Sequence, residues 1–294
     1  MKKILVTGGT GFIGRNVVEA FADIYDVSAP SHAELELADA RAVRGYFRGK
    51  NFDAVIHCAI KPGHRNAKDA AGLLYSNTRQ FFNLADCSDS WGKMVLLTSG
   101  LVYNQNQYSP KMKEEYSGEY PPEDEVGFAK YLCARYAEKC GGKITELRPF
   151  GVYGKYEDYA IRFISNALCK TLFDMPVTIK QNRRFDYVHV ADLVAAVRHF
   201  VENPARHAAY NVTPDKSAEL AHIAALALEI SGRKLPVIIK TSGMGAEYSG
   251  DNSRLKAEFP DFPRTGLKEG MLSLYQWYAA RKNSLDKSLL LEDK

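Results

Sequence analysis

The chain has 294 residues, of which 46% are apolar, 11% aromatic and 25% charged, a composition that excludes a disordered or fibrous protein. The 39 Lys and Arg residues exceed the 35 Asp and Glu residues by only four, with no long run of either sign, so nucleic-acid binding is not expected. No stretch approaches the roughly 18 apolar residues of a membrane span, the amino terminus does not resemble a signal peptide, and the five cysteines show no CxxC spacing. We therefore expect a cytoplasmic protein without membrane segments, disulfides or structural zinc.

The first half of the chain alternates short apolar runs with longer helical patterns. Strands are predicted at 2–7, 27–29, 53–58, 93–99 and 143–147, and helices at 12–23, 39–48, 68–86 and 125–139. Strands that alternate with helices of this length predict an α/β fold, a doubly wound parallel sheet of the Rossmann type with helices on both faces. We assign residues 1–150 to this dinucleotide-binding domain.

The second half has more turn residues and a less regular pattern. Strands are predicted at 176–181 and 187–190, and helices at 191–202, 217–232 and 268–281, with a loose tail from residue 283. This pattern predicts a smaller mixed α/β domain at 151–294 for substrate binding. The two domains are expected to be interwoven, with about 191–213 returning to the first sheet.

A glycine-rich turn follows the first predicted strand and opens the first helix. Its sequence, TGGTGFIG, places glycines at positions 8, 11 and 14. Gly8 permits a tight turn, Gly11 lets a pyrophosphate approach the backbone, and Gly14 lets the helix pack closely on the strand. The free N–H groups and the positive end of the helix dipole then favour phosphate, so the turn predicts dinucleotide binding.

Several segments, in order along nearly the whole chain, resemble the extended short-chain dehydrogenase/reductase superfamily of nucleotide-sugar epimerases, dehydratases and ketoreductases. The GxxGxxG spacing of the turn is the first. His57-Cys58-Ala59 resembles the family motif "HxA", and Asn77 resembles the Asn of the helix after it. Residues 97–103 (LTSGLVY) resemble "SSxxVY", and residues 147–154 (LRPFGVYG) resemble "LRxxNVYG". Residues 186–193 (DYVHVADL) resemble "DYVHVxDL", and residues 251–255 resemble "DNSRL". Within the superfamily, 33–43 is most similar to GDP-fucose synthases and dTDP-4-dehydrorhamnose reductases.

The resemblance implies a set of site residues. Ser99 is implied as the catalytic hydroxyl that binds and polarises the sugar 4-oxygen, and Lys130 as the cation that holds the nicotinamide ribose. The implied cofactor-binding residues are Gly8, Thr10, Gly11, Phe12, Ile13, Gly14, Ser31, His32, Glu36, Leu37, Cys58, Ala59, Asn77, Lys130 and Pro149. No metal site is implied.

The identity of the nicotinamide cofactor depends on the residues after the second strand. NAD-preferring members carry a carboxylate there for the ribose 2′-hydroxyl, whereas this chain has Pro30-Ser31-His32. Ser31 and His32 could accommodate a 2′-phosphate; the alternative is that both are ordinary loop residues. Glu36 and Leu37 resemble the pair that flanks the adenine. NADP(H) is therefore favoured, and NAD(H) remains possible.

One expected catalytic residue is missing. Family members place Tyr four residues before the Lys, so that both lie on one helix face and the cation favours the tyrosinate. Val126 stands at the Tyr position before Lys130, and valine has no proton to give. His64 and five tyrosines (Tyr108, Tyr116, Tyr120, Tyr156 and Tyr159) are alternative donors among which the sequence does not choose.

The carboxyl-terminal half also departs from the family pattern. Gly151 replaces the Asn of "NVYG", and Phe185 stands where an Arg normally precedes "DYVHV". Arg184 and Arg254 are the substrate-binding candidates, because a guanidinium matches the oxygens of a diphosphate.

The predicted function is that of an NADP(H)-dependent oxidoreductase or epimerase. We expect it to act on a nucleotide-activated sugar, with 4-keto reduction by hydride transfer at sugar C4 as the leading reaction. The alternative is a non-catalytic cofactor-binding protein of the same fold, acting as a sensor or partner subunit. By analogy with relatives, helices 68–86 and 125–139 would form a homodimer.

Overall fold

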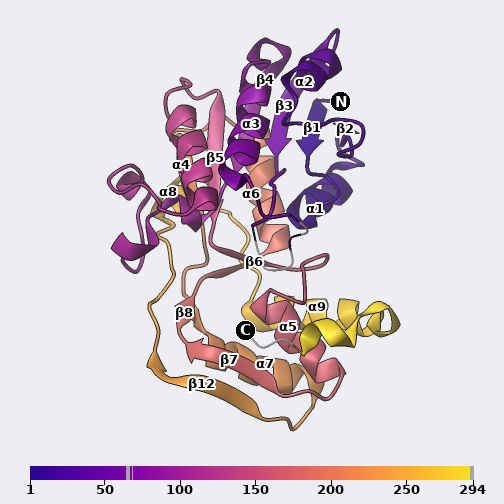
Figure 1. Cartoon of the computed structure of the whole chain (residues 1–294), viewed down its shortest axis with the longest axis vertical. Helices are drawn as coiled ribbons and strands as arrows, with labels where there is room; N and C mark the ends of the chain where they lie inside the picture. Colours follow the sequence, from indigo (N-terminus) through magenta and orange to yellow (C-terminus); the bar gives the residue numbers. More distant parts are fainter. Residues whose placement is uncertain (64–66, 68, 292–294) are drawn as a thin grey trace.

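A six-stranded parallel sheet forms the amino-terminal lobe, drawn at the top of Figure 1. The computed structural model describes residues 1–63, 67 and 69–291. The strand order is β10-β5-β4-β3-β1-β2, so the sheet is doubly wound outward from β1 as the sequence predicts. The strands are β1 (Lys3–Thr7), β2 (Asp26–Ser28), β3 (Phe52–His57), β4 (Trp91–Leu97), β5 (Ile144–Pro149) and β10 (Ala209–Val212).

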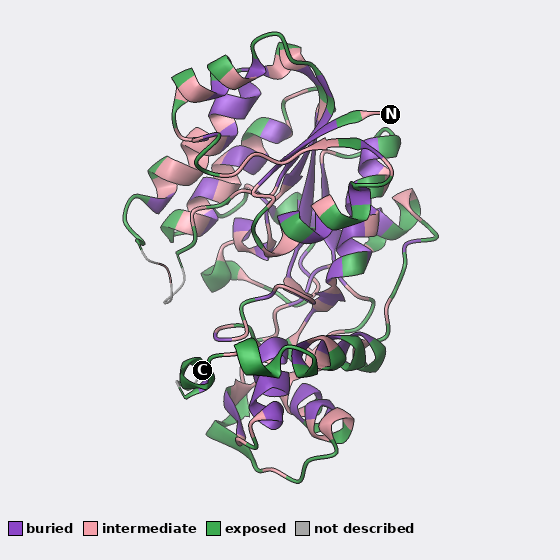
Figure 2. Cartoon of the chain, turned by 90° about the vertical axis from the view of Figure 1, so that its right-hand side faces the viewer, coloured by how far each residue is buried: buried purple, intermediate pink, exposed green. Residues whose placement is uncertain are grey.

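Helices cover both faces of this sheet because successive strand residues point to opposite sides. In β1, Ile4 and Val6 pack with α1 (Phe12–Phe21) and α6 (Val190–Glu202). Leu5 packs instead with the other layer of helices, which consists of α2 (Ala40–Phe47), α3 (Leu73–Ala85) and α4 (Glu125–Ala137). Figure 2 shows the buried residues concentrated in the strands and on the helix faces toward them.

The expected elements of this lobe are present, and only one boundary differs from the prediction by more than two residues. The helix expected at 68–86 begins at Leu73, because Gly72 before it has left-handed backbone angles (φ 61°, ψ 37°) that end the preceding segment. Residue 68 and the candidate donor His64 lie outside the described residues.

A smaller lobe at the bottom of Figure 1 has its own core. Its three main helices are α5 (Phe163–Leu172), α7 (Leu220–Ser231) and α9 (Leu267–Ala279). Its strands form three two-stranded pairs: β7 (Val177–Asn182) with β12 (Val237–Met244), β8 (Arg184–Phe185) with β11 (Ala218–Glu219), and β6 (Gly151–Tyr153) with β9 (Tyr187–His189). These strand pairs lie beside the helices of the smaller lobe.

Three features of the smaller lobe differ from the sequence-based expectation. The sequence analysis predicts neither α5, although its apolar residues at 163, 164, 167, 168 and 172 recur at helical spacing, nor β12, whose eight residues are all exposed. The tail as far as residue 291 is also not loose, because the 3₁₀ helix η6 (Lys287–Leu290) places Leu290 in the core of this lobe.

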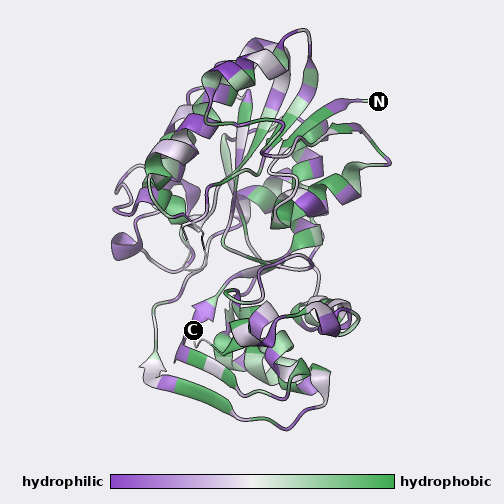
Figure 3. Cartoon of the chain, turned by 45° about the vertical axis from the view of Figure 1, so that its right-hand side comes forward, coloured by the Kyte–Doolittle hydropathy of each residue, from purple (hydrophilic) through white to green (hydrophobic). Residues whose placement is uncertain are grey.

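The chain returns from the smaller lobe to the first sheet. α6 packs on the sheet, β10 extends it beside β5, and the short helix α8 (Ser253–Glu258) lies next to β10. Five further 3₁₀ helices are η1 (Ser88–Ser90), η2 (Gly100–Val102), η3 (Gln105–Gln107), η4 (Glu114–Tyr116) and η5 (Lys282–Ser284). Figure 3 shows hydrophobic residues concentrated in the sheet strands. Within the described ranges, no helix is long and apolar enough to cross a membrane.

Candidate active site

The carboxyl ends of β1, β3, β4 and β5 meet at the edge of the sheet that faces the smaller lobe, and most predicted site residues follow these ends. Gly8 is the first residue after β1, Cys58 is the first after β3, and Ser99 is the second after β4. Pro149 is the last residue of β5. The sheet thus brings together segments that are far apart in the sequence.

The glycine-rich turn is built by backbone contacts that leave no room for side chains. Gly8 has a positive φ of 69°, and a Cβ atom on it would stand 2.7 Å from the backbone nitrogen of Ala59. A Cβ atom on Gly14 would collide with the carbonyl oxygen of Gly8. The requirement for glycine at these two positions is therefore structural.

Gly11 differs from Gly8 and Gly14 because it faces solvent. A Cβ atom on Gly11 would meet only the Gly8 oxygen, at 3.3 Å. Gly11 is also the N-cap of α1, and its cap makes no side-chain hydrogen bond, so the first N–H groups of the helix are available. Thr10 is exposed, and Phe12 and Ile13 are half-buried at the start of the helix. This open cradle of N–H groups fits a dinucleotide pyrophosphate.

The segment after β2 holds the residues predicted to select the cofactor. The Ser31 amide and hydroxyl both donate to the Glu34 carboxylate, at 2.7 and 2.8 Å, and His32 lies 3.0 Å from Glu36. Both hydrogen bonds lower the pKa of Glu34, and the bond from the Ser31 amide has the larger effect. Leu37 is buried. A 2′-phosphate at Ser31 would therefore have to displace the Glu34 carboxylate.

The segment after β3 is tied to both of its neighbours. The buried ring of His57 shares a 2.7 Å hydrogen bond with the Thr7 hydroxyl of β1. Burial, and then the nearby Lys130 cation, lower the pKa of His57 to about 4, so the ring is neutral at pH 7. Asn77 of α3 accepts a hydrogen bond from the Lys61 amide at 2.7 Å and donates to its carbonyl at 3.2 Å. Asn77 thus holds the loop that continues from Cys58 and Ala59.

Lys130 is a cation with little access to solvent. It lies on α4, close enough to His57 to affect its pKa, and burial lowers the pKa of Lys130 to about 8 against the opposing effect of Glu146. Among the described residues it has no hydrogen-bond or ion-pair partner. An unpaired, buried ammonium is suited to bind hydroxyl groups such as those of a ribose.

Ser99 and Val126 occupy the other two positions of the predicted catalytic centre. Ser99 caps η2, and its hydroxyl accepts a weak hydrogen bond from the Leu101 amide at 3.3 Å. Val126 lies one helical turn before Lys130, so the two share a face of α4. A Cβ atom on Gly63 would stand 3.0 Å from a methyl of Val126, which shows that this side chain points to the loop after β3.

A buried polar network supports the ends of β4 and β5 beneath these residues. Arg148 is fully buried, and its guanidinium lies 2.7 Å from Glu146 and donates to the Tyr103 hydroxyl at 3.0 Å. The Thr98 hydroxyl donates to the other side of Glu146. Because Thr98 and Tyr103 flank the Ser99 segment, this network fixes its position. The sequence analysis missed the network; an acidic and a basic residue two apart in an otherwise apolar strand are the signal for it.

The two predicted substrate arginines lie apart from each other, and each is paired with carboxylates. Arg184 on β8 lies 3.0 Å from Glu219 in the smaller lobe. Arg254 on α8 lies 3.0 Å from Glu115 and 3.7 Å from Glu114.

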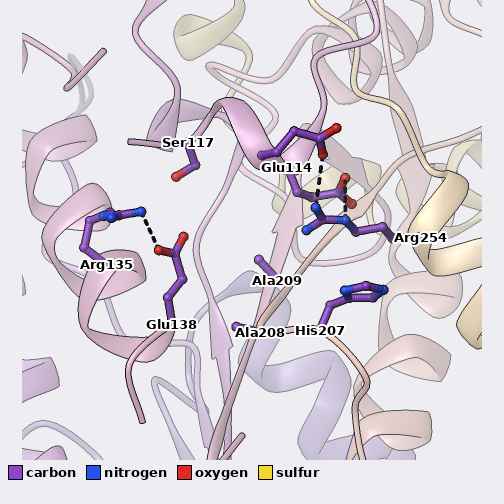
Figure 4. Close-up of a pocket in the computed structure, with 9 residues that line it drawn as sticks. Glu114, Ser117, Arg135, Glu138, His207, Ala208, Ala209 and Arg254 are labelled. Carbon is purple, nitrogen blue, oxygen red and sulfur yellow. Dashed lines mark hydrogen bonds and ion pairs between the residues drawn. The ribbon is translucent and has the colours of Figure 1, made fainter. Parts of the chain in front are cut away.

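Arg254 borders a cavity of about 260 Å³ beside the amino end of β10. Figure 4 shows Arg254 with Glu114 on one side of this cavity, and Arg135 paired with Glu138 on the other. The charges that line it thus pair with one another. The structure does not bring Arg254 together with Ser99 at the carboxyl edge of the sheet.

The tyrosines proposed as donors are mostly engaged elsewhere. The Tyr108 hydroxyl donates to the Ser249 carbonyl at 2.6 Å, and that of Tyr156 donates to Glu19 at 2.6 Å. The Tyr159 hydroxyl accepts from the Asp286 amide at 2.9 Å. Tyr116 and Tyr120 are exposed beside a small cavity of about 120 Å³.

The sheet order, the glycine cradle and the Ser and Lys side chains at the sheet edge define a Rossmann-type dinucleotide-binding enzyme. The profile of the NAD dependent epimerase/dehydratase family matches residues 4–213, and the chain belongs to this family. In the part of the chain that the structure describes, no group of three His, Cys, Asp or Glu side chains could hold a metal ion.

Individual relatives match over almost the full length. The chain is 28% identical to a dTDP-4-dehydro-6-deoxy-D-allose reductase from a Streptomyces species, over 96% of this chain and 97% of the relative. It is 23% identical to the GDP-L-fucose synthase of Escherichia coli, over 94% and 96% of the two chains.

A solved structure shares the fold. The GDP-mannoheptose C4 reductase MlghC from Campylobacter jejuni, with NADP bound, has a TM-score of 0.80 at 21% identity and covers 94% of this chain and 98% of its own.

Proposed function

We propose that the protein is a cytoplasmic, NADPH-dependent reductase of a nucleotide-activated 4-keto sugar. The observation that carries the proposal is the placement of Ser99 and the unpaired Lys130 at the same sheet edge as the open glycine cradle. Similarity over the full length to a nucleotide-sugar 4-keto reductase supports the reaction class. A non-catalytic cofactor-binding protein, suggested by Val126, is less well supported because that similarity is to enzymes.

The cofactor would lie across the carboxyl edge of the sheet. The turn formed by Gly8, Thr10, Gly11, Phe12, Ile13 and Gly14 would hold the pyrophosphate. Ser31, His32, Glu36 and Leu37 would hold the adenosine end, and Cys58, Ala59, Asn77, Lys130 and Pro149 would border the nicotinamide end. When bound, the cofactor supplies the hydride.

The protein side chains would bind and polarise the sugar. Ser99 donates its hydroxyl proton in a hydrogen bond to the 4-oxygen, while the Lys130 ammonium holds the ribose and adds positive charge near the reacting carbonyl. Of the two predicted arginines, Arg184 is proposed as the main ligand of the diphosphate because it belongs to the smaller lobe. Arg254, which is paired with two carboxylates beside the amino end of β10, is proposed to contribute little. We also propose a homodimer through α3 and α4, which pack side by side and expose Tyr75 and Tyr136.

The proposal is tested by following NADPH or NADH oxidation with a panel of dTDP- and GDP-linked 4-keto-6-deoxyhexoses. We expect turnover of at least one of them, with NADPH preferred. A protein that binds NADPH but reduces none of the panel would contradict reductase function. Equal or better use of NADH would contradict the cofactor preference alone.

A further inference from the structure

The proposed reaction lacks an assigned proton donor, because Val126 stands where the family has tyrosine. Reduction of a ketone needs a proton for the oxygen as well as a hydride for the carbon. A donor must have a free hydroxyl, lie at the end of β4 near Ser99, and remain protonated at neutral pH. One tyrosine outside the sequence-based candidates meets all three conditions.

Tyr248 approaches the segment of Ser99 from the smaller lobe. It follows β12 in the smaller lobe, and its hydroxyl lies against Gly100, the residue directly after Ser99. A Cβ atom on Gly100 would collide with that hydroxyl oxygen. The absence of a side chain at position 100 therefore makes room for the phenol at the end of β4.

The ring of Tyr248 is held in this place from several directions. Its centroid lies 4.8 Å from that of Phe150, 4.8 Å from that of Phe185 and 5.2 Å from that of Tyr108. Its amide donates to the Arg184 carbonyl at 2.9 Å. A ring fixed by three aromatic neighbours and by its backbone is positioned in advance, which is what a proton donor requires.

The Tyr248 hydroxyl is free, unlike those of the other tyrosines around it. The Tyr103 hydroxyl donates to Asn211 at 2.8 Å, and that of Tyr108 donates to the Ser249 carbonyl. Tyr248 has no hydrogen-bond partner for its hydroxyl anywhere in the described ranges. Burial raises the pKa of Tyr248 above its ordinary value, so that the phenol keeps its proton at neutral pH.

We propose that Tyr248 is the catalytic proton donor to the sugar 4-oxygen, in place of the tyrosine lost at position 126. This inference rests on the proposed reductase function. As the carbonyl carbon accepts the hydride from NADPH, the π electron pair moves to the oxygen, which takes the phenolic proton of Tyr248. The O–H bond of Tyr248 breaks, an alcohol forms, and the resulting tyrosinate regains a proton from water. The donor thus comes from the smaller lobe, while Ser99, after β4, and Lys130, on α4, come from the amino-terminal lobe.

The test compares Tyr248→Phe with Tyr153→Phe. Tyr153 is a matched control because its buried hydroxyl also lacks a partner in the described chain but packs against Gly270 of α9. For the sugar that the wild type reduces, we expect Tyr248→Phe to lower kcat by about 10²–10⁴-fold. NADPH affinity and the KM for the sugar should remain within about twofold of wild type, and the Tm should be unchanged. Tyr153→Phe should keep the wild-type kcat.

Two further variants separate chemistry from packing. Adding Val126→Tyr to Tyr248→Phe places a phenol beside Lys130 and should restore kcat by at least tenfold. Replacing Tyr248 by 3-fluorotyrosine makes the phenol more acidic at nearly the same volume, so the alkaline limb of the kcat profile should shift to lower pH. This variant also tests the role if Tyr248→Phe does not fold.

The outcomes are distinguishable. An active wild type whose Tyr248→Phe variant keeps its kcat, or whose fluorotyrosine variant keeps its pH profile, would overturn the role of Tyr248 and leave the reductase function standing. A wild type that reduces none of the dTDP- and GDP-linked sugars would overturn both.

Discussion

The two lobes contribute to the proposed site in different ways. On the sheet side, the cofactor cradle consists of backbone, and its geometry depends on the absence of side chains at Gly8 and Gly14. On the side of the smaller lobe, the candidate groups are the side chains of Arg184 and Tyr248, and Arg184 is held by an ion pair. A site made of backbone is specified by local sequence, whereas a site made of side chains depends on contacts between distant segments.

The strongest test of this contrast is Gly14→Val. The added Cβ atom would collide with the Gly8 carbonyl oxygen, which is backbone and cannot turn away. We expect a loss of about 3 kcal/mol or more in the free energy of unfolding, at the upper end of overpacking costs. Urea denaturation measures it. Gly45→Ala on α2, where a Cβ atom meets nothing within 4 Å, is the control and should be neutral or slightly stabilising. A Gly14→Val protein as stable as wild type would show that the turn is less tightly packed than described.

Gly11→Val separates binding from folding within the same turn. Its Cβ atom would meet only the Gly8 carbonyl oxygen, at 3.3 Å, so the Tm should fall by less than about 3 °C, which for a chain of this length corresponds to roughly 1–2 kcal/mol. The valine methyl groups would occupy the proposed pyrophosphate position, and we expect NADPH affinity to fall at least 100-fold, or about 2.7 kcal/mol. Calorimetric titration measures the affinity. Retained binding would mean that the cofactor does not use this turn.

The same distinction explains how much could be predicted from the sequence. The α/β class, the parallel sheet and the segments that end at its carboxyl edge follow from local patterns: apolar runs, glycine spacing and the helix periods between them. Ser99 comes to this edge because it is the last residue of the strand predicted at 93–99. Lys130 comes there because it lies near the start of the helix that follows that strand.

Contacts between distant segments could not be predicted in this way. The sequence shows that Arg254 is basic, but not that Glu114 and Glu115, about 140 residues earlier, lie beside it. Tyr248 meets Gly100 through a contact between segments that lie about 150 residues apart in the sequence. β12 escaped prediction for a related reason: its place is set by pairing with β7, about 60 residues away, and not by a buried face of its own.

Lys130 is a side chain of the amino-terminal lobe, and its burial has a measurable effect on the free energy of unfolding. Its pKa falls from 10.5 to about 8 on folding because of burial, so the protonated side chain costs stability at pH 7. Between about pH 8 and 10.5 the unfolded chain binds more protons than the folded one, so this cost is relieved as the pH rises. Lys130→Met should therefore be more stable than wild type at pH 7 by about 1–3 kcal/mol, and the gain should shrink toward pH 10. Urea denaturation at the two pH values measures this, with the exposed Lys139→Met as control; a gain that is independent of pH would contradict it.

The smallest expected effects belong to the two arginines, and they test whether the smaller lobe binds the diphosphate as proposed. Arg184 is an exposed surface ion pair, so Arg184→Ala should cost less than about 1 kcal/mol of stability. If its guanidinium leaves Glu219 for the diphosphate, the variant should bind a dTDP- or GDP-linked sugar about tenfold more weakly, a loss near 1.4 kcal/mol. Arg254 is held by two carboxylates beside the amino end of β10, and we expect Arg254→Ala to change that affinity by less than threefold. Calorimetry with the NADPH-loaded protein distinguishes the two variants. A larger loss for Arg254→Ala than for Arg184→Ala would place the diphosphate in the cavity of Figure 4, and the substrate would then approach the sheet from its outer edge.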